Sequence, residues 1–216
     1  ATVSNATAAT TLATTNTYTI KVTTVDNAGN SATRTQIVKI DKEAPTAPEI
    51  TNPSNGAWTN GNVTITAKST DAHSGIDKIE WYENGAWTTR ALTTTDGTGV
   101  ITYTADRNET IRFRAVDKAG NASSESTTVV KIDKTSPSDT APTAISTTNT
   151  ITVTSKQTDS LSGIKSGTIQ YAIMKGTTWS AWQTSNQFTG LTHNTEYKVK
   201  TKVTDNAGNT KESLTT

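Results

Sequence analysis

Apolar and polar residues alternate over short stretches of this chain. The pattern is clear in residues 63–68, VTITAK, and in residues 111–115, IRFRA, where apolar side chains recur at every second position. A period of two predicts β-strands that bury one face, and no segment shows the period of an amphipathic helix. The chain is therefore expected to be all-β. In its middle part the strands are expected at residues 63–70, 76–83, 86–92, 100–105, 111–116 and 124–132.

Two sequence elements repeat along the chain in one register. The string DNAGN at Asp26 recurs as DKAGN at Asp117, 91 residues later, and as DNAGN at Asp205, a further 88 residues later. The string DAHSGI at Asp71 recurs as DSLSGI at Asp159, again 88 residues later. Self-similarity at this period indicates a tandem array in which each repeat is one small β-sandwich.

The segments VKIDKEAP, residues 38–45, and VKIDKTSP, residues 130–137, mark the module boundaries. In both, an apolar strand end runs into a charged stretch with a proline that cannot continue a β-ladder. Cuts after Lys42 and after Lys134 divide the chain into three predicted modules, residues 1–42, 43–134 and 135–216.

The first predicted module is expected to be incomplete. By register it begins before strand E of a sandwich and supplies about the last three strands, which leaves an apolar face and a strand edge open. We expect the second module, another copy of the chain or a separate chain to complete residues 1–42. Because the sequence starts at Ala1 without an initiator Met or a signal segment, it is expected to be an internal piece of a longer protein.

Two short motifs predict tight turns. Asn84-Gly85 lies between two predicted strands, and a two-residue type I′ loop needs positive φ at both positions, so a hairpin between strands C and C′ is expected. In each DNAGN or DKAGN string, Gly can adopt a left-handed backbone and the leading Asp can accept turn N–H groups. These strings are interpreted as the hairpins between strands F and G.

Composition and charge narrow the function classes. Only 31% of the residues are apolar, which is natural for thin sandwiches with polar outward positions. The formal net charge is +1, so the field that draws a protein to nucleic acid or an anionic membrane is missing. The chain has no Cys, which excludes disulfides and thiol chemistry, and no apolar run long enough for membrane insertion. We expect neither a nucleic-acid partner nor insertion into a membrane.

Residues 190–199, GLTHNTEYKV, resemble the E–F segment of fibronectin type III domains, Leu-x-Pro-x-Thr-x-Tyr-x-Val, with His193 in place of Pro. The resemblance implies that Tyr197, and Tyr18 by register in the first module, are tyrosine corners whose hydroxyls bond back to the backbone. The second module has Glu109 at this position.

Across the whole chain, the Asp-x-Ala-Gly-Asn strings, Ser-Gly-Ile turns and Lys-Ile-Asp-Lys linkers resemble the bacterial Ig-like repeats of large cell-wall and secreted proteins. The resemblance implies tandem immunoglobulin-like or fibronectin-III-like β-sandwiches, outside the cell or on its surface, with neighbouring Ig-like modules as partners. The leading hypothesis is a non-catalytic spacer that holds other domains away from the surface. The alternatives are a ligand-binding module, such as an adhesin or a carbohydrate-binding domain, and a structural module of a phage tail or other appendage.

The polar residues form no catalytic pattern. His73 and His193 belong to different modules and to no metal-binding or nucleophile motif. Asp77 and Glu80 could in principle do acid–base work, but a narrow sandwich rarely offers a pocket that shifts carboxyl pKa values. Both are expected to be solvated, and the chain is not expected to be an enzyme.

Tryptophans supply a candidate glycan site. Trp87, Trp179 and Trp182 fall in the region of strand C′, and the spacing of the last two predicts opposite faces of a strand, with one ring in solvent. An exposed indole can stack on a sugar, although the same rings can equally cover the sheet face. Trp81, beside Ile79, is expected in the core.

Aspartates supply a candidate calcium site at the N-terminal pole of each complete module, where the entering linker meets the B–C and F–G loops. Several carboxylates from separate loops would repel one another there unless a hard cation held them. The alternative is that each Asp only caps a tight turn. The expected ligands are Asp41, Glu43, Asp71 and Asp117 for the second module, and Asp133, Asp159 and Asp205 for the third.

Overall fold

A computed structural model describes residues 11–83, 85–90 and 96–214. All regular structure in these residues is β-strand, as the alternation predicts, and no helix long and apolar enough to cross a membrane occurs among them. The chain forms two compact units. One comprises Ala1–Ile50, Thr66–Val100 and Arg112–Thr127, and the other comprises Thr51–Ile65, Ile101–Ile111 and Thr128–Thr216. The linkers after Lys42 and Lys134 each lie inside one unit.

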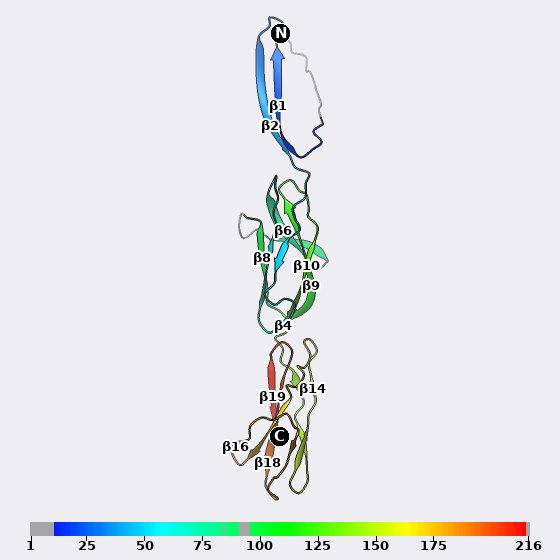
Figure 1. Ribbon diagram of the computed structural model, residues 1–216, viewed down its shortest axis with the longest axis vertical. Helices are drawn as coiled ribbons and strands as arrows, with labels where there is room; N and C mark the ends of the chain where they lie inside the picture. Colours follow the sequence, from blue (N-terminus) through cyan, green and yellow to red (C-terminus); the bar gives the residue numbers. More distant parts are fainter. Residues whose placement is uncertain (1–10, 84, 91–95, 215–216) are drawn as a thin grey trace. The chain divides into compact units, whose positions relative to one another are not determined.

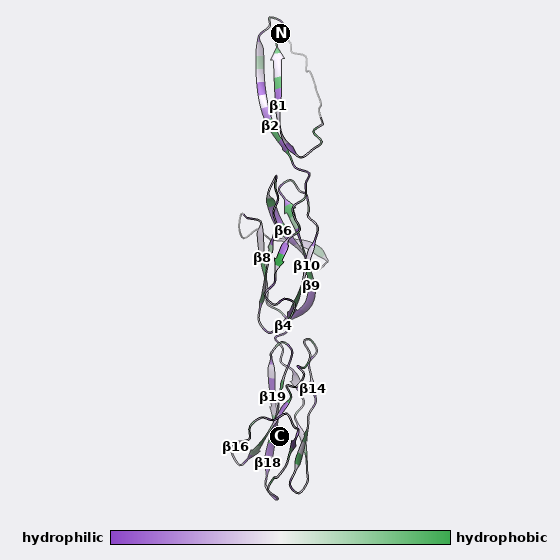
Figure 2. Ribbon diagram, in the orientation of Figure 1, coloured by the Kyte–Doolittle hydropathy of each residue, from purple (hydrophilic) through white to green (hydrophobic). Residues whose placement is uncertain are grey.

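The first predicted module is a long two-stranded hairpin in its described part. β1 (Asn16–Val25) pairs antiparallel with β2 (Ser31–Ile40), and the two strands run side by side in Figure 1. Isolated hydrophobic positions alternate with hydrophilic ones along β1 (Figure 2), and Val22, Val25 and Ile37 are each more than half exposed. These open apolar side chains agree with an incomplete sandwich, and the partner that would complete it stays a prediction.

The second predicted module contains two β-sheets. One has the strand order β4-β10-β9-β6-β7, with β4 parallel to β10 and β6 antiparallel to β7 and β9, and the other has the order β3-β5-β8. The strands are β3 (Glu49–Thr51), β4 (Trp58–Thr59), β5 (Val63–Lys68), β6 (Ile76–Glu83), β7 (Ala86–Arg90), β8 (Thr98–Tyr103), β9 (Arg107–Asp117) and β10 (Ser126–Ile132).

These strands lie close to the predicted ones, because alternating apolar residues mark the buried face. β6 has the predicted bounds, and β9 begins earlier than predicted, at Arg107. Ile79 and Trp81 are each 1% exposed, which confirms Trp81 as a core residue. The predicted end of strand C′ at residues 91–92 lies outside the described residues.

The third predicted module has several smaller sheets. A four-stranded antiparallel sheet has the order β16-β15-β18-β19, and a three-stranded one has the order β12-β13-β17. Val153, Ile173, Phe188 and Val199 form its buried core. The strands are β11 (Ser138–Asp139), β12 (Thr143–Ser146), β13 (Ile151–Thr154), β14 (Gln157–Thr158), β15 (Gln170–Lys175), β16 (Thr178–Trp179), β17 (Gln187–Phe188), β18 (Tyr197–Thr204) and β19 (Thr210–Leu214).

The predicted turns and corners are confirmed. Glu83 pairs with Ala86, which makes the β6–β7 connection a two-residue hairpin with Gly85 at φ +81°, although Asn84 itself lies outside the described residues. The Tyr18 hydroxyl donates to the Thr14 carbonyl at 3.2 Å, and the Tyr197 hydroxyl accepts the Thr192 N–H at 3.0 Å. In the second module, Glu109 instead pairs with Arg107 at 3.2 Å.

Candidate metal centres at the module junctions

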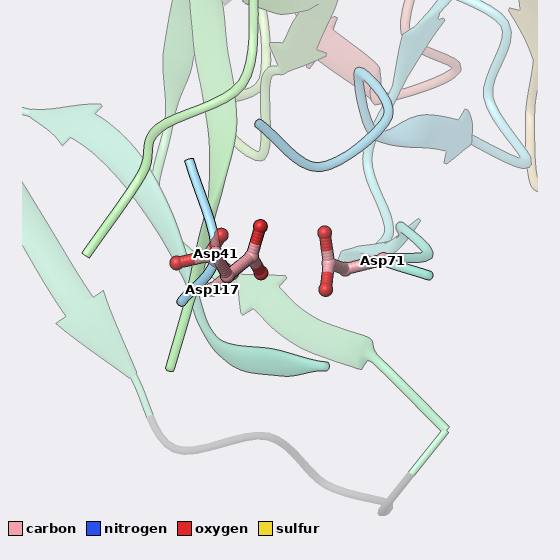
Figure 3. Close-up of side chains that lie close together, drawn as sticks. All are labelled: Asp41, Asp71 and Asp117. Atoms are coloured by element: carbon pink, nitrogen blue, oxygen red, sulfur yellow. The ribbon is translucent and has the colours of Figure 1, made fainter. Parts of the chain in front are cut away.

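The structure brings six of the seven predicted acids together in two triads. Asp41, Asp71 and Asp117 form the first triad, and Asp133, Asp159 and Asp205 form the second. In each triad, one oxygen from every carboxylate lies within 4.8 Å of the other two, and Figure 3 shows the three side chains of the first triad close together. Glu43 is not a member, because its side chain is 65% exposed and lies 3.7 Å from Nδ1 of His73.

Turns position the B–C loop aspartates. Oδ1 of Asp71 accepts the backbone N–H groups of His73, Ser74 and Gly75 at 3.0, 2.8 and 2.7 Å. Oδ1 of Asp159 accepts those of Leu161 and Gly163 at 3.1 and 2.6 Å. The turn-capping role is therefore confirmed for both residues. It is compatible with metal binding, because a carboxylate has a second oxygen and further lone pairs.

The F–G turns position the third aspartate of each triad and connect it to the linker. Asp117 accepts the N–H groups of Ala119 and Asn121 at 2.9 and 2.8 Å, and the Asn121 amide donates to Oδ2 of Asp117 at 2.7 Å. The same amide group reaches the carbonyl of Asp41 at 3.3 Å. Asn209 repeats this arrangement in the third module, donating to Asp205 and to the carbonyl of Asp133, both at 2.8 Å.

The triads concentrate negative charge with little exposure to water. Asp117, Asp133 and Asp205 are at most 1% exposed. No ion pair among the described residues reaches any of the six carboxylates. Two unit charges at such a separation repel by roughly 3 kcal/mol at an effective dielectric constant of about 20. The N–H groups of Glu43 and Ser74 donate to the carboxylate of Asp41, both at 3.0 Å.

The donor set fits a hard divalent cation such as calcium. All triad ligands are carboxylate oxygens, which Ca²⁺ prefers, and several anions without a cationic partner fit a divalent charge. A further observation comes from Ser162, which is 8% exposed and whose hydroxyl has no hydrogen-bond partner among the described residues. Its N–H donates to Oδ2 of Asp133 at 3.0 Å, so a buried hydroxyl without a partner belongs to the residue beside the second triad. Metal binding itself stays a prediction.

The linker after β10 is bonded both to the second module and to the third. The N–H of Asp133 donates to the Thr59 carbonyl at 3.0 Å, and the N–H of Lys134 donates to Oδ1 of Asp106 at 2.7 Å. Nζ of Lys134 reaches Oδ1 of Asn62 at 2.6 Å. On the other side, Asp133 receives the Ser162 N–H and the Asn209 amide. Hydrogen bonds therefore join this linker to residues on both sides of it.

The linker after β2 repeats this pattern with different donors and acceptors. The N–H of Lys42 donates to Oγ1 of Thr15 at 2.9 Å, and its Nζ reaches the Ala13 carbonyl at 2.9 Å. Sequence reasoning missed Thr15 and Asp106. Their separation of 91 residues, the same as that of the first two F–G turns, was the signal that could have found them.

The ring of Trp87 is covered by cationic side chains. The Arg114 guanidinium lies 4.3 Å from its centroid and that of Arg112 lies 5.5 Å away, while Tyr82 packs edge-on at 5.4 Å. This arrangement supports the alternative interpretation, in which the indole covers the sheet face. A glycan contact at Trp87 stays a prediction.

The expectation that Trp179 and Trp182 lie on opposite faces is wrong. Nζ of Lys200 lies 4.7 Å from the centroid of one ring and 4.5 Å from the other, so both rings meet the same ammonium. The physical reason is that β16 ends at Trp179, so the alternation of a strand does not extend to Trp182.

The expectation that Glu80 is solvated is also wrong, whereas Asp77 is exposed as predicted. Glu80 is 6% exposed and pairs with Nζ of Lys78 and with the guanidinium of Arg114, both at 2.8 Å. Burial by itself would raise the pKa of Glu80, but hydrogen bonds and charge attraction from Lys78 and Arg114 outweigh it and lower the pKa below the ordinary value.

Replacing Glu80 with Gln is expected to destabilise the second module by about 1–3 kcal/mol at neutral pH, because Lys78 and Arg114 lose their carboxylate. A carboxyl whose folded-state pKa is lowered stabilises the fold above its unfolded pKa, about 4.3, and loses that contribution as the pH falls through the folded pKa. The gap in urea midpoint between the native chain and Glu80→Gln should therefore shrink as the pH is lowered from 7 to 3. Glu109→Gln, at a more exposed ion pair, should shift the midpoint little at any pH; an equal shift would contradict the role of Glu80.

Comparison with known proteins identifies two stretches of the chain that match protein families. Residues 47–129 match the family described as Bacterial Ig domain, and residues 141–215 match the family described as Bacterial Ig-like domain. Exoglucanase B of Cellulomonas fimi is 34% identical over 180 residues, which are 78% of this chain and 16% of that protein. The chain therefore spans only a small part of this relative.

One of the similar solved structures shows the fold. A crystal structure of titin domains has a TM-score of 0.52 at 14% identity and covers 94% of this chain and 73% of that chain. Fibronectin(III)-like modules of CbhA from Clostridium thermocellum have a TM-score of 0.37 at 16% identity, with coverage of 77% and 92%. At 14% identity the titin likeness shows the fold alone. The two family matches, over residues 47–129 and 141–215, make this chain a member of the bacterial Ig-like domain family.

Proposed function

We propose that this chain is a non-catalytic spacer of a bacterial extracellular or cell-surface protein, made of modules 1–42, 43–134 and 135–216, whose junctions bind calcium. The observation that carries the proposal is the repeated construction of the junction. In both linkers an Asp bonds to the loops of the module that follows, and the next Lys bonds to the module before it. A linker that is hydrogen-bonded on both sides suits a spacer, because a spacer must keep the domains at its two ends a set distance apart.

Calcium would add to this fixation at a definite place. Asp41 and Asp133 belong to the linkers, whereas their triad partners belong to the B–C and F–G loops of the following module. A cation bound by all three would join linker and module, because separating them would then break metal–oxygen contacts. The cation supplies charge neutralisation and a link between loops, and the carboxylates and the Ser162 hydroxyl are the groups offered to it.

The extracellular setting is supported by family and by relative. The matching family is bacterial, and Exoglucanase B is similar to this chain over a small part of its own length. A module that recurs as a minor part of a larger protein fits an accessory role. The rival function, a ligand-binding module, is favoured by one feature of the third module, the Lys200 ammonium beside the rings of Trp179 and Trp182.

The spacer function can be tested by measuring a distance distribution across the second junction. The chain has no native Cys, so Thr88→Cys and Thr148→Cys place two spin labels in the full chain, one on the second module and one on the third. We expect a narrow distribution with calcium and a broader one with chelator. Asp106→Ala should broaden it further with chelator, because the N–H of Lys134 and the Thr135 hydroxyl lose their acceptor.

Asp77→Ala is the matched control, since Asp77 is an exposed acid of the second module away from the linker. It should leave the distribution unchanged in both conditions. A distribution that is broad in every condition, or that responds equally to Asp77→Ala and Asp106→Ala, would contradict the spacer function.

A further inference from the structure

The outer face of the sheet β16-β15-β18-β19 carries a row of lysines beside two indoles. Lys198, Lys200 and Lys202 alternate along β18 with the buried residues Val199, Thr201 and Val203, so all three point away from the core. Nζ of Lys200 lies within 4.7 Å of both the Trp179 and the Trp182 ring centroids, and Nζ of Lys202 lies 5.7 Å from that of Trp182. Cations and aromatic surface therefore meet at one place.

The second module has a related face at equivalent positions. Arg112 and Arg114 precede Lys200 and Lys202 by 88 residues, and Trp87 is the indole beside them. There, however, the cations have close acidic partners. Glu125 accepts from Nε and Nη2 of Arg112 at 2.7 and 2.6 Å, and the buried Glu80 pairs with Arg114 at 2.8 Å.

The third module neutralises its cations less closely. Opposite Lys202 stand the neutral Gln170 on β15 and Glu212 on β19, whereas opposite Arg114 on β6 stands the buried Glu80. Within the described residues, the single ion pair of the lysine row joins Lys200 to the same Glu212, at 3.4 Å with a carboxylate side chain that is 48% exposed. The face therefore keeps an excess of positive charge in a chain whose net charge is only +1.

We infer that this face, defined by Lys198, Lys200, Lys202, Trp179 and Trp182, binds an acidic polysaccharide of the polyuronate type. Nζ of Lys200 lies over both indoles, as the Arg114 guanidinium lies over Trp87, but the acid that pairs with Lys200 is half exposed, whereas the acid that pairs with Arg114 is buried. A ligand carboxylate can therefore pair with Lys200, and the apolar side of its sugar ring can pack against the two indoles. The alternating lysines offer cations roughly 7 Å apart along the strand, which suits a ligand with charges repeated along a chain. Because the face is positively charged, an acidic glycan should bind to it more tightly than a neutral one.

A single-stranded nucleic acid is the other polyanion that stacks on aromatic side chains. The structure favours the glycan, because three lysines on one sheet of a nearly neutral chain make a small field, whereas nucleic-acid binding draws its affinity from extended positive potential. This inference goes beyond the spacer function and does not depend on it.

The test is a titration of the full chain with polygalacturonate in low salt and chelator. Binding is measured by the change in indole fluorescence and by calorimetry. The chelator keeps calcium away from both the carboxylate triads and the polymer. We expect saturable binding that weakens as salt is raised. Lys200→Gln with Lys202→Gln should lower the affinity about tenfold and flatten its salt dependence, because ionic contacts release counterions. Trp182→Ala should lower the affinity by a similar factor, and Lys200→Arg with Lys202→Arg should retain binding.

Lys211→Gln is the matched control. Lys211 is exposed on β19 of the same sheet, but it pairs with the inward-facing Val203 and so lies off the lysine face. Removing its charge should leave the affinity within about twofold. The inference is overturned if Lys211→Gln weakens binding as much as the double variant, if neutral dextran binds as tightly as polygalacturonate, if a single-stranded oligonucleotide binds more tightly, or if polygalacturonate does not bind at low salt.

Discussion

Replacing Trp81 with Ala is expected to lower the free energy of unfolding of the second module by about 3–5 kcal/mol. Trp81 is 1% exposed and lies in the middle of β6, directly opposite Phe113 of β9. The substitution removes a large apolar side chain from the core. It leaves a cavity that β6 and its neighbours β7 and β9 cannot fill without disturbing their pairing. Because net stability of a domain is of order 5–15 kcal/mol, the loss should be severe.

Native-state hydrogen exchange on the full chain measures this loss strand by strand, because protection is read separately at each backbone amide. Amides of β6 and β9 should lose protection in Trp81→Ala, whereas those of β15 and β18 should keep it. Trp87→Ala is the control, since its half-buried ring lies on the outer face of the same hairpin, and about 1 kcal/mol is expected. Trp81→Phe should recover much of the protection. An equal loss in Trp81→Ala and Trp87→Ala would contradict the assignment of Trp81 to the core.

The strands and turns could be predicted because local sequence carries their signal. β6 matches the predicted residues, since alternation of apolar side chains is read directly from neighbouring positions. The F–G hairpins were predictable from three copies of one string. In each copy the Asp side chain caps the turn, and Gly29, Gly120 and Gly208 adopt φ of +90°, +95° and +100°. Such turns depend on residues that are adjacent in the chain.

Contacts set by distant residues escaped prediction. The burial of Glu80 depends on Arg114, which lies on another strand, and nothing near Glu80 in the sequence distinguishes it from Asp77. The shared face of Trp179 and Trp182 depends on where β16 ends and on Lys200 of β18. Asp106 was missed because its partners, Lys134 and Thr135, belong to a linker.

The two aspartate triads could be predicted only in part. The register of the repeat predicted which acids would converge, because linker, B–C loop and F–G loop meet at one pole of a sandwich. The register could not predict that the Glu43 side chain points toward His73. Glu43 lies two residues beyond Asp41, and the repeat does not fix the direction of its side chain. Nor could it separate metal ligands from turn caps, because the same aspartates cap turns in any case.

Asp205→Asn is expected to abolish the calcium-dependent stabilisation of the third module. If calcium binds only the folded state, a free concentration one hundred times Kd adds about 2.7 kcal/mol, which raises the melting temperature of a domain of this size by about 10 °C or more. Asp205 is fully buried in the second triad, and the variant removes one of its three charges. Calorimetric melting of the full chain with calcium and with chelator should show that the transition of the third module no longer shifts, while that of the second still does.

Asp26→Asn separates the metal from the turn. Asp26 accepts the N–H groups of Ala28 and Asn30, both at 2.9 Å, and the Asn30 amide at 2.8 Å. Asp205 caps its own turn in a similar way, accepting the N–H groups of Gly208 and Asn209 and the Asn209 amide. Among the described residues, however, it belongs to no triad. In both variants the new amide oxygen can still accept the backbone N–H groups, but the oxygen that accepts the amide of Asn30 or Asn209 is replaced by a second NH₂ group. Both should therefore destabilise their own hairpin in chelator, but only Asp205→Asn should remove a calcium response. A melting curve that calcium does not move in the native chain would leave all six aspartates as turn caps, because a ligand of the folded state must stabilise it.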